Sequence, residues 1–260
     1  MNKYLKVWFR AIGLELSRHM AYKANFIMKV LAVMIMDFVG PLVVLLIYQS
    51  TPGIPGWTFP QFILFQGTLT LIFGIGHMFM VMIPVQCIEE IRSGTFDKIL
   101  TKPFKPLTYL TLTSVDIDGV GEVIVGLALI IWAFGALNLG FGVNFLFYLA
   151  LLAVALLFEY SAHVLIASMA FIAVKSWALF DVLFRLKMFG RYPASIYNPG
   201  LQMFLTFIFP IAIAAFYPVE VLLKGMSISV LWAVLAVVGF SIVTRLFWAY
   251  AMKKYTSAGG

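Results

Sequence analysis

The chain has 260 residues, of which 63% are hydrophobic and 11% are charged, and its mean hydropathy is +1.01. This composition excludes an ordinary water-soluble domain, whose surface needs more polar side chains. The formal net charge of +7 suits contact with anionic lipid headgroups, and no separate basic domain points to nucleic acid as a partner.

Long uncharged or nearly uncharged stretches recur along the chain. They are long enough to cross about 30 Å of hydrocarbon as helices, and they lack the short alternating pattern of a membrane β-barrel. We therefore expect an all-α, multi-pass protein that forms a single domain over residues 1–260. The predicted membrane spans are 24–49, 58–86, 107–136, 145–174, 200–218 and 228–252.

The positive residues predict the orientation of these spans. All Lys and Arg residues except Lys224 fall in the N-terminal segment, the 87–106 loop, the 175–199 loop or the C-terminal end, if Lys29 and Arg245 are counted with the nearest end. By the positive-inside rule both termini are expected in the cytoplasm, and the protein in the cytoplasmic (inner) membrane.

Residues 1–23 have the pattern of an amphipathic helix rather than of a signal peptide. Apolar residues such as Trp8 and Ile12 fall on one face, and Lys3, Lys6 and Arg10 fall on another. The pattern predicts a helix that lies in the inner membrane interface. The alternative is a cytoplasmic helix that packs on the rest of the protein.

Asp37 lies near the middle of the first predicted span. A charge at this depth is costly and usually faces protein or water. Asp37 is therefore either part of a translocation path or a polar contact between helices.

The loop 87–106 carries many of the charges of the chain and a short helix. Thr95 is expected to cap this helix, Asp97 to lie in its first turn, and Pro103 to end it. The apolar residues Phe96, Ile99 and Leu100 share one face of this helix, which is too short to be stable alone. The face therefore docks either on a partner protein or on the inner ends of the chain's own spans.

The third predicted span begins with three acids, Asp116, Asp118 and Glu122. Because they precede the longest uncharged run of the span, we expect them to border cytoplasmic water. They form either a solvated or Arg-paired helix end, or the mouth of an inward-facing cavity in which Asp118 and Glu122 share one face.

Glu159 lies near the middle of the fourth predicted span, and His163 follows one helical turn later on the same face. They are candidates for the lining of a translocation path. The alternative is an interhelical hydrogen bond, for which Tyr160, Gln66 and His77 are the candidate partners.

The predicted loop 175–199 is amphipathic, and Asp181 and Arg185 have the spacing of a helical ion pair. Together with Arg191 they would form a second contact with a cytoplasmic partner. The alternative is simple anchoring of the loop at the inner leaflet.

Three stretches carry a resemblance to a known family: "IEEIRSGTFDKILTKPFKPLTYL", "FGRYPASIYNPGLQMFLTFIFPIAIAAFYP" and "RLFWAYAMKKYTSAGG". They resemble the type-two ATP-binding-cassette exporter permeases, in particular a bacterial subfamily known only as ABC-2 family transporter proteins. The first stretch is similar to the coupling segment of that family, a short cytoplasmic helix that sits in a groove of the ATPase subunit.

The resemblance implies a permease subunit that exports an unidentified substrate, with a mild preference for a lipidic or amphipathic one. Its partners would be two ATPase subunits, which hold the ATP and Mg, and a second permease, identical or a sister chain. The chain itself would need no cofactor, and it contains no G-x-x-x-x-G-K-[ST] phosphate loop. The implied coupling residues are Glu89, Glu90, Arg92, Gly94, Thr95, Phe96, Asp97, Ile99, Leu100 and Pro103.

Two other function classes fit the sequence less well. An ion-coupled secondary transporter or channel would use Asp37 and Glu159 as ion sites, but we see no inverted repeat between the two halves. The chain lacks the motifs of an intramembrane enzyme. The Glu-Glu-x-x-x-Arg pattern of a membrane protease, if it started at Glu89, would need Arg at position 94, which is Gly94. His19, His77 and His163 lie in separate segments without metal-ligand spacing, so the sequence predicts no metal site.

Overall fold

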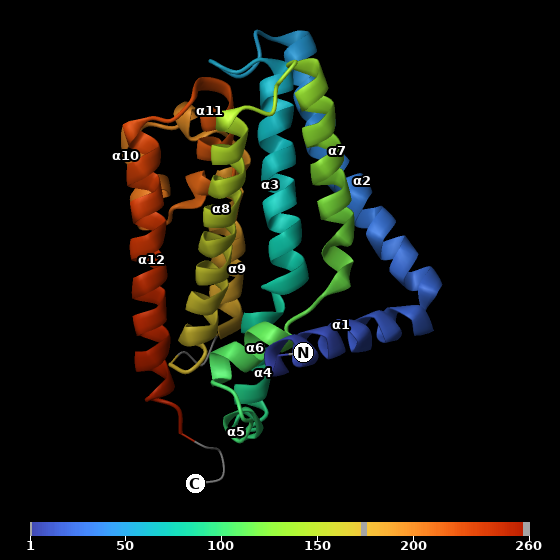
Figure 1. Ribbon diagram of the computed structural model, residues 1–260, viewed down its shortest axis with the longest axis vertical. Coiled ribbons are helices and arrows are strands. Elements are labelled where there is room, and N and C mark those ends of the chain that lie inside the picture. Colours follow the sequence, from blue (N-terminus) through green and yellow to red (C-terminus); the bar gives the residue numbers. More distant parts are fainter. Residues whose placement is uncertain (1, 173–175, 257–260) are drawn as a thin grey trace.

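The computed structural model describes residues 2–172 and 176–256, and every regular element in that part of the chain is a helix (Figure 1). Five helical segments are long and apolar enough to cross a membrane, which confirms the all-α membrane class. They overlap five of the six predicted spans. The segments are Lys23–Ser50, Phe59–Arg92, Ile117–Ala136, Val143–Met169 and Ile228–Met252.

Helix α1 (Lys3–Ala21) lies across the lower end of the bundle in Figure 1, next to α6 (Pro106–Thr113), and α2 (Lys23–Ser50) rises from its far end. The side chain of Asn2 caps α1 by accepting from the amide of Tyr4. Trp8 packs against Phe79, with 6.1 Å between the ring centroids, so one face of α1 contacts the bundle. Lys3, Lys6 and Arg10 stay exposed, and the membrane-interface location of α1 stays a prediction.

Helices α3 (Phe59–Phe79) and α7 (Val120–Ala136) form the closest pair of the bundle. Glycines allow this approach: a Cβ atom at Gly67 would lie 2.8 Å from Leu129 Cβ, and one at Gly126 would lie 2.5 Å from the backbone nitrogen of Leu71. Backbones this close gain van der Waals contact, which is a main source of helix association in lipid.

The predicted loop 175–199 runs along the bundle instead of lying at one end. Helix α9 (Ser176–Met188) is followed by the 3₁₀ turns η2 (Phe189–Arg191) and η3 (Ala194–Ile196). Along this path Lys187 lies over the ring of Phe73, the Gln66 amide donates to the Arg191 carbonyl, and Trp57 donates to the Ser195 hydroxyl. These partners follow one another toward the start of α3, so the segment travels from the end that holds α5 (Asp97–Leu100) to the end that holds Trp57. We call these the α5 end and the Trp57 end.

The predicted span 200–218 is wrong, because this segment folds as a hairpin. It consists of α10 (Pro199–Met203), a π turn η4 (Phe204–Ile208), a 3₁₀ turn η5 (Ile211–Ala214) and α11 (Phe216–Lys224). Pro210 lies at the turning point, where its missing N–H and fixed φ prevent one continuous helix.

The hairpin enters the bundle only part of the way. At its turn Phe209 packs on Phe158, near the middle of α8 (Val143–Met169), and on Phe240, near the middle of α12 (Ile228–Met252). After α11 the chain is back at the Trp57 end, since Gly225 lies beside Asn144 at the start of α8. Hydropathy alone cannot distinguish such a hairpin from a span.

Candidate functional site

The turn between α4 (Met82–Arg92) and α5 is the candidate coupling site. Gly94 ends α4 with a φ of +69°, a conformation that other residues rarely adopt. The amides of Thr95 and Phe96 both donate to the Glu90 carbonyl, and the Thr95 hydroxyl donates to the Glu90 carboxylate. The predicted capping of α5 by Thr95 is wrong: α5 begins without a side-chain cap, and Thr95 closes the preceding turn.

Phe96 is fully buried and does not project from this turn. Its ring centroid lies 5.0 Å from that of Phe171 and 5.1 Å from that of Tyr255, and Phe171 packs edge-on against Trp248 at 5.3 Å. We call Phe96, Phe171, Trp248 and Tyr255 the aromatic cluster. It joins α5 to the residues that follow α8 and to the last turns of α12.

The other two residues of the predicted docking face differ in exposure. Ile99 is 5% exposed and belongs to the same buried core, whereas Leu100 is 43% exposed. Packing on the chain's own helices, the alternative that the sequence left open, therefore describes Phe96 and Ile99. Of the three, Leu100 alone presents a large apolar surface to a partner.

Around Leu100 the turn exposes charged side chains of both signs. Asp97 is half-buried beside Tyr255; burial raises the pKa of the Tyr255 phenol, and the Asp97 carboxylate acts in the same direction. We give the name α5 tip surface to six of the exposed residues in this region. They are Glu89, Arg92, Lys98, Leu100, Lys102 and Pro103.

Asp181, Arg185 and Arg191 have exposed side chains that are spread along the bundle instead of meeting at the α5 end. Asp181 and Arg185 are on α9, which packs along α8, and Arg191 lies beside Gln66 in the half of α3 that is nearer to the Trp57 end. The predicted loop therefore does not lie at one end of the bundle, and the second cytoplasmic contact stays a prediction. The sequence treated the charges of this segment as a sign of water, although Lys187 makes an internal polar contact.

That internal contact is a buried ion pair in the middle of the bundle. Lys187 Nζ donates to Oε2 of Glu159 at 2.8 Å, and both residues are buried. His163 Nδ1 lies 2.8 Å from the backbone carbonyl of Glu159 and 3.8 Å from its Oε2. Gly76 leaves room for the carboxylate, because a Cβ atom there would lie 3.2 Å from Oε2.

Of the two interpretations of Glu159 and His163, the structure therefore displays a contact between helices. The partner of Glu159 is Lys187 on α9 and not one of the three candidates from the sequence. The side chains of Glu159 and His163 both have an exposed fraction of 0%, so neither lines an open channel within this subunit. Their place in a translocation path stays a prediction.

Asp37 lies on a different part of the surface. It is half-buried on α2, a helix most of whose apolar side chains are exposed. Among the residues that the structure describes, its Oδ2 is buried and has no hydrogen-bond partner. Asp37 therefore adjoins a face that a lipid or another subunit can cover.

Asp118 and Glu122 belong to a network where α1, α2, α3 and the start of α7 meet. Lys29 Nζ lies 3.3 Å from Oδ2 of Asp118, and His19 Nε2 lies 3.6 Å from its Oδ1. Glu122 pairs with His77 at 2.6 Å. The predicted Arg-paired helix end is thus a helix end paired with Lys and His.

Sequence reasoning missed several members of this network. His19 and Glu15 lie on α1 with i, i+4 spacing, 3.0 Å apart, and His77 also approaches Asp116 at 3.9 Å. The i, i+4 pair of Glu15 and His19 was visible in the sequence as a short acid–histidine motif. Its approach to Asp116 was not, because these residues are about 100 positions apart.

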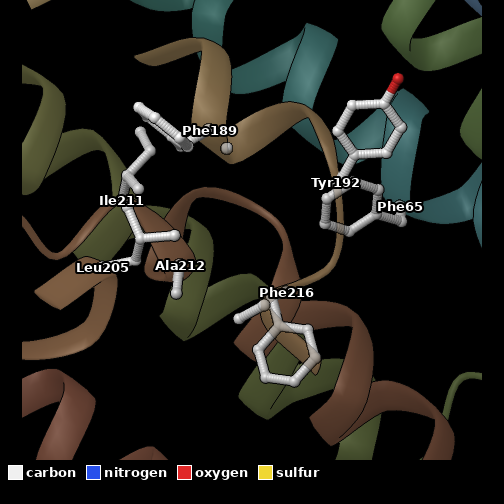
Figure 2. A pocket seen from close by; sticks show the side chains of 9 residues that line it. Phe65, Phe189, Tyr192, Leu205, Ile211, Ala212 and Phe216 are labelled. Carbon is white, nitrogen blue, oxygen red and sulfur yellow. The ribbon is translucent and has the colours of Figure 1, made fainter. Parts of the chain in front are cut away.

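The described part of the chain has two cavities of very different size. Figure 2 shows the first, near the Trp57 end, which holds about 10 Å³ and is lined mainly by apolar side chains such as Phe65, Ile211 and Phe216. That is about the room for one water molecule. The second, of about 340 Å³, is a groove between α1 and the helices α4 and α6, and its lining includes Arg10, Glu15 and Asp116.

One comparison with known proteins identifies a family. A family model described as "ABC-2 family transporter protein" matches residues 31–259. No curated protein and no solved structure matches the chain.

Proposed function

This chain belongs to the ABC-2 family of transporter proteins, and from that membership we propose that it is the permease subunit of an ATP-driven exporter. The observation that carries the proposal is the family match, which covers nearly the whole chain. Family and fold together make it a multi-pass transport component of the cytoplasmic membrane rather than a catalytic chain. The ATP-driven step, the outward direction and the partner chains are the proposed part.

We place the contact with the ATPase subunits at the α5 tip surface. Leu100 supplies the apolar contact, and Glu89, Arg92 and Lys98 supply complementary charges around it. Such a surface has the usual arrangement of a protein–protein contact, an apolar centre within a polar rim.

Phe96 and Ile99 have a different task in this proposal: they fix α5 to the bundle. The aromatic cluster connects α5 with α8 and α12, so a displacement of α5 by the ATPase moves the ends of two membrane helices. Packed side chains transmit such shifts because they do not deform continuously.

The second permease, identical or a sister chain, would cover exposed faces of α2 and α9. These faces carry Asp37, Asp181 and Arg185, which are costly to leave against lipid. A path between two subunits lined by such groups accounts for their exposure, whereas the paired Glu159 and His163 would stabilise each half. The substrate stays undefined, and a lipidic or amphipathic molecule is our preference.

The test is purification of the tagged chain from its native membrane in mild detergent, followed by identification of the proteins that accompany it. An ABC ATPase and a permease in stoichiometric amounts support the proposal. Leu100→Ser, which changes only an exposed side chain, should lower the amount of ATPase recovered while the amount of second permease stays the same.

A chain that purifies alone and transports or conducts without ATP would contradict the proposal. That result would favour the alternative from the sequence, an ion-coupled secondary transporter or channel. A control variant at an exposed position far from the tip, Ser229→Ala at the Trp57 end, should leave the recovery of both partners unchanged.

A further inference from the structure

We propose that Glu15, His19 and Asp116, with Asp118 beside His19, form a site for a divalent transition-metal ion, for which Zn²⁺ is the best fit. The two helix residues come from α1, and the two aspartates come from the turn that precedes α7. An ion in this position would clamp α1 to the bundle. The inference does not depend on the transport function proposed above.

The ligand atoms of Glu15, His19 and Asp116 lie close enough together to converge on one ion. Zn²⁺ binds His nitrogen and carboxylate oxygen at about 2.0–2.2 Å, which places neighbouring ligand atoms roughly 3.4 Å apart in a tetrahedron. His19 Nε2 lies 3.0 Å from Oε1 of Glu15 and 3.6 Å from Oδ1 of Asp118. One ligand atom from each of Glu15, His19 and Asp116 lies within 4.8 Å of the others.

The groups around these ligands hold them in position. His19 is 8% exposed, so its ring is fixed by packing, in part against Phe26. Lys29 donates to Oδ2 of Asp118, which leaves Oδ1 directed at His19. That Oδ1 atom is buried, and no residue in the described part of the chain donates a hydrogen bond to it. Hydrogen bonds and packing of this kind around the ligand side chains orient metal ligands in proteins.

The charge balance of the network also favours a divalent cation. With the histidines counted as neutral, four carboxylates face two cations within the network, a formal excess of two negative charges. A divalent ion would compensate this excess. The carboxylates are those of Glu15, Asp116, Asp118 and Glu122, and the cations are Arg18 and Lys29.

An ion can reach the ligands from the groove between α1 and the bundle. Glu15, Arg18 and Asp116 all line this groove. Arg18 contacts the same Glu15 oxygen as His19, but its side chain is 65% exposed and can turn away at little cost. The site therefore has ligands, outer contacts and an access route, which are the features that a metal site requires.

The test uses the full chain, purified in detergent with a tag that contains no histidine and stripped of metal by a chelator. Titration calorimetry with Zn²⁺ should give one saturable site per chain. His19→Gln and Asp116→Asn should each weaken binding at least about tenfold, because each removes a ligand. Arg18→Met is the matched control within the same cluster, and it should bind Zn²⁺ at least as tightly as the wild type.

X-ray absorption at the zinc edge of the wild-type protein keeps the test valid if a variant does not fold. One histidine nitrogen and oxygen neighbours at about 2.0–2.2 Å would support the site. The proposal fails if the wild type shows no saturable binding, or if His19→Gln binds as tightly as the wild type. It also fails if the spectrum shows that zinc has no histidine ligand, or that it has two.

Discussion

Lys187 and Glu159, from helices α9 and α8, form an ion pair with 2.8 Å between Nζ and Oε2 in the middle of the helix bundle. The pair explains how α9, which carries several charged residues, packs with one face against α8. The Lys187 ammonium also lies 4.2 Å from the ring centroid of Phe73, so an aromatic face of α3 adds to the stabilisation of the cation.

Breaking this pair from one side should be strongly destabilising. Lys187→Met leaves the Glu159 carboxylate buried without its cation and should cost about 3–5 kcal/mol. The double variant Lys187→Met with Glu159→Gln should recover much of that loss, because no unpaired charge remains. Thermal unfolding of the purified protein in detergent measures both effects.

The exposed pair of Lys224 and Glu220 provides the control, because the Lys224 side chain is 72% exposed and the pair is 3.3 Å apart. Lys224→Met should change stability by less than about 1 kcal/mol. If Lys187→Met and Lys224→Met lowered the free energy of unfolding equally, the internal pair would stabilise the protein no more than the exposed one.

The close pair α3 and α7 should tolerate no added methyl group at its contact. In Gly126→Ala the new Cβ atom would lie 2.5 Å from the backbone nitrogen of Leu71. Because the clashing atom belongs to the backbone, rotation of a side chain cannot relieve the clash. We expect a loss of about 1–3 kcal/mol from overpacking. Gly135→Ala on the same helix meets no atom within 4 Å and should be neutral or slightly stabilising. A similar melting temperature for the two variants would contradict the packing.

Phe96 and Leu100, four positions apart, should separate folding from coupling. Phe96→Ala empties a buried aromatic position and should cost about 3–5 kcal/mol of stability. Leu100→Ser should change stability by no more than about 0.5 kcal/mol, because the side chain is exposed. Melting curves check this difference directly, and a destabilised Leu100→Ser protein would show that Leu100 packs on the bundle.

The path of residues 176–196 along the bundle can be tested with single cysteines. Cys87 is buried, and no other cysteine occurs in the sequence, so the background of labelling should be low. A cysteine at Ser195 should react with a membrane-impermeant maleimide on the same side of the membrane as one at Ser50, and on the opposite side from one at Lys98. Labelling of Ser195→Cys together with Lys98→Cys would restore the cytoplasmic loop that the sequence predicted.

The sequence predicts the helical class and five long segments because each has an uninterrupted apolar run of membrane length. The prediction fails at residues 176–218, because hydropathy and the number of charges there suggest a loop and a span where the structure has a packed helix and a hairpin. Lys187 looks like a loop residue because its partner Glu159 is 28 positions away, and the hairpin around Pro210 looks like a span because both of its arms are apolar.

The same limit applies to the candidate site. The i, i+4 spacing of Glu15 and His19 is local and visible, but their approach to Asp116 and Asp118 depends on the angle between α1 and α7. Likewise the pattern of Phe96, Ile99 and Leu100 predicts a shared apolar face, but it does not tell which of these side chains turns inward. Phe96 turns inward because the aromatic cluster, which includes Trp248 and Tyr255 from the far end of the chain, packs around it.

The hairpin Pro199–Lys224 imposes an order on the biosynthesis of this protein. Its turn rests on Phe158 of α8 and on Phe240 of α12, and α12 leaves the ribosome after the hairpin does. Until α12 has been inserted, Phe209 lacks Phe240, one of its two aromatic neighbours. The backbone around Pro210 is then not yet covered by protein on the side that faces α12. The hairpin therefore takes its final depth only when the last helix arrives, and a ribosome that stalls before residue 228 leaves it uncovered on that side.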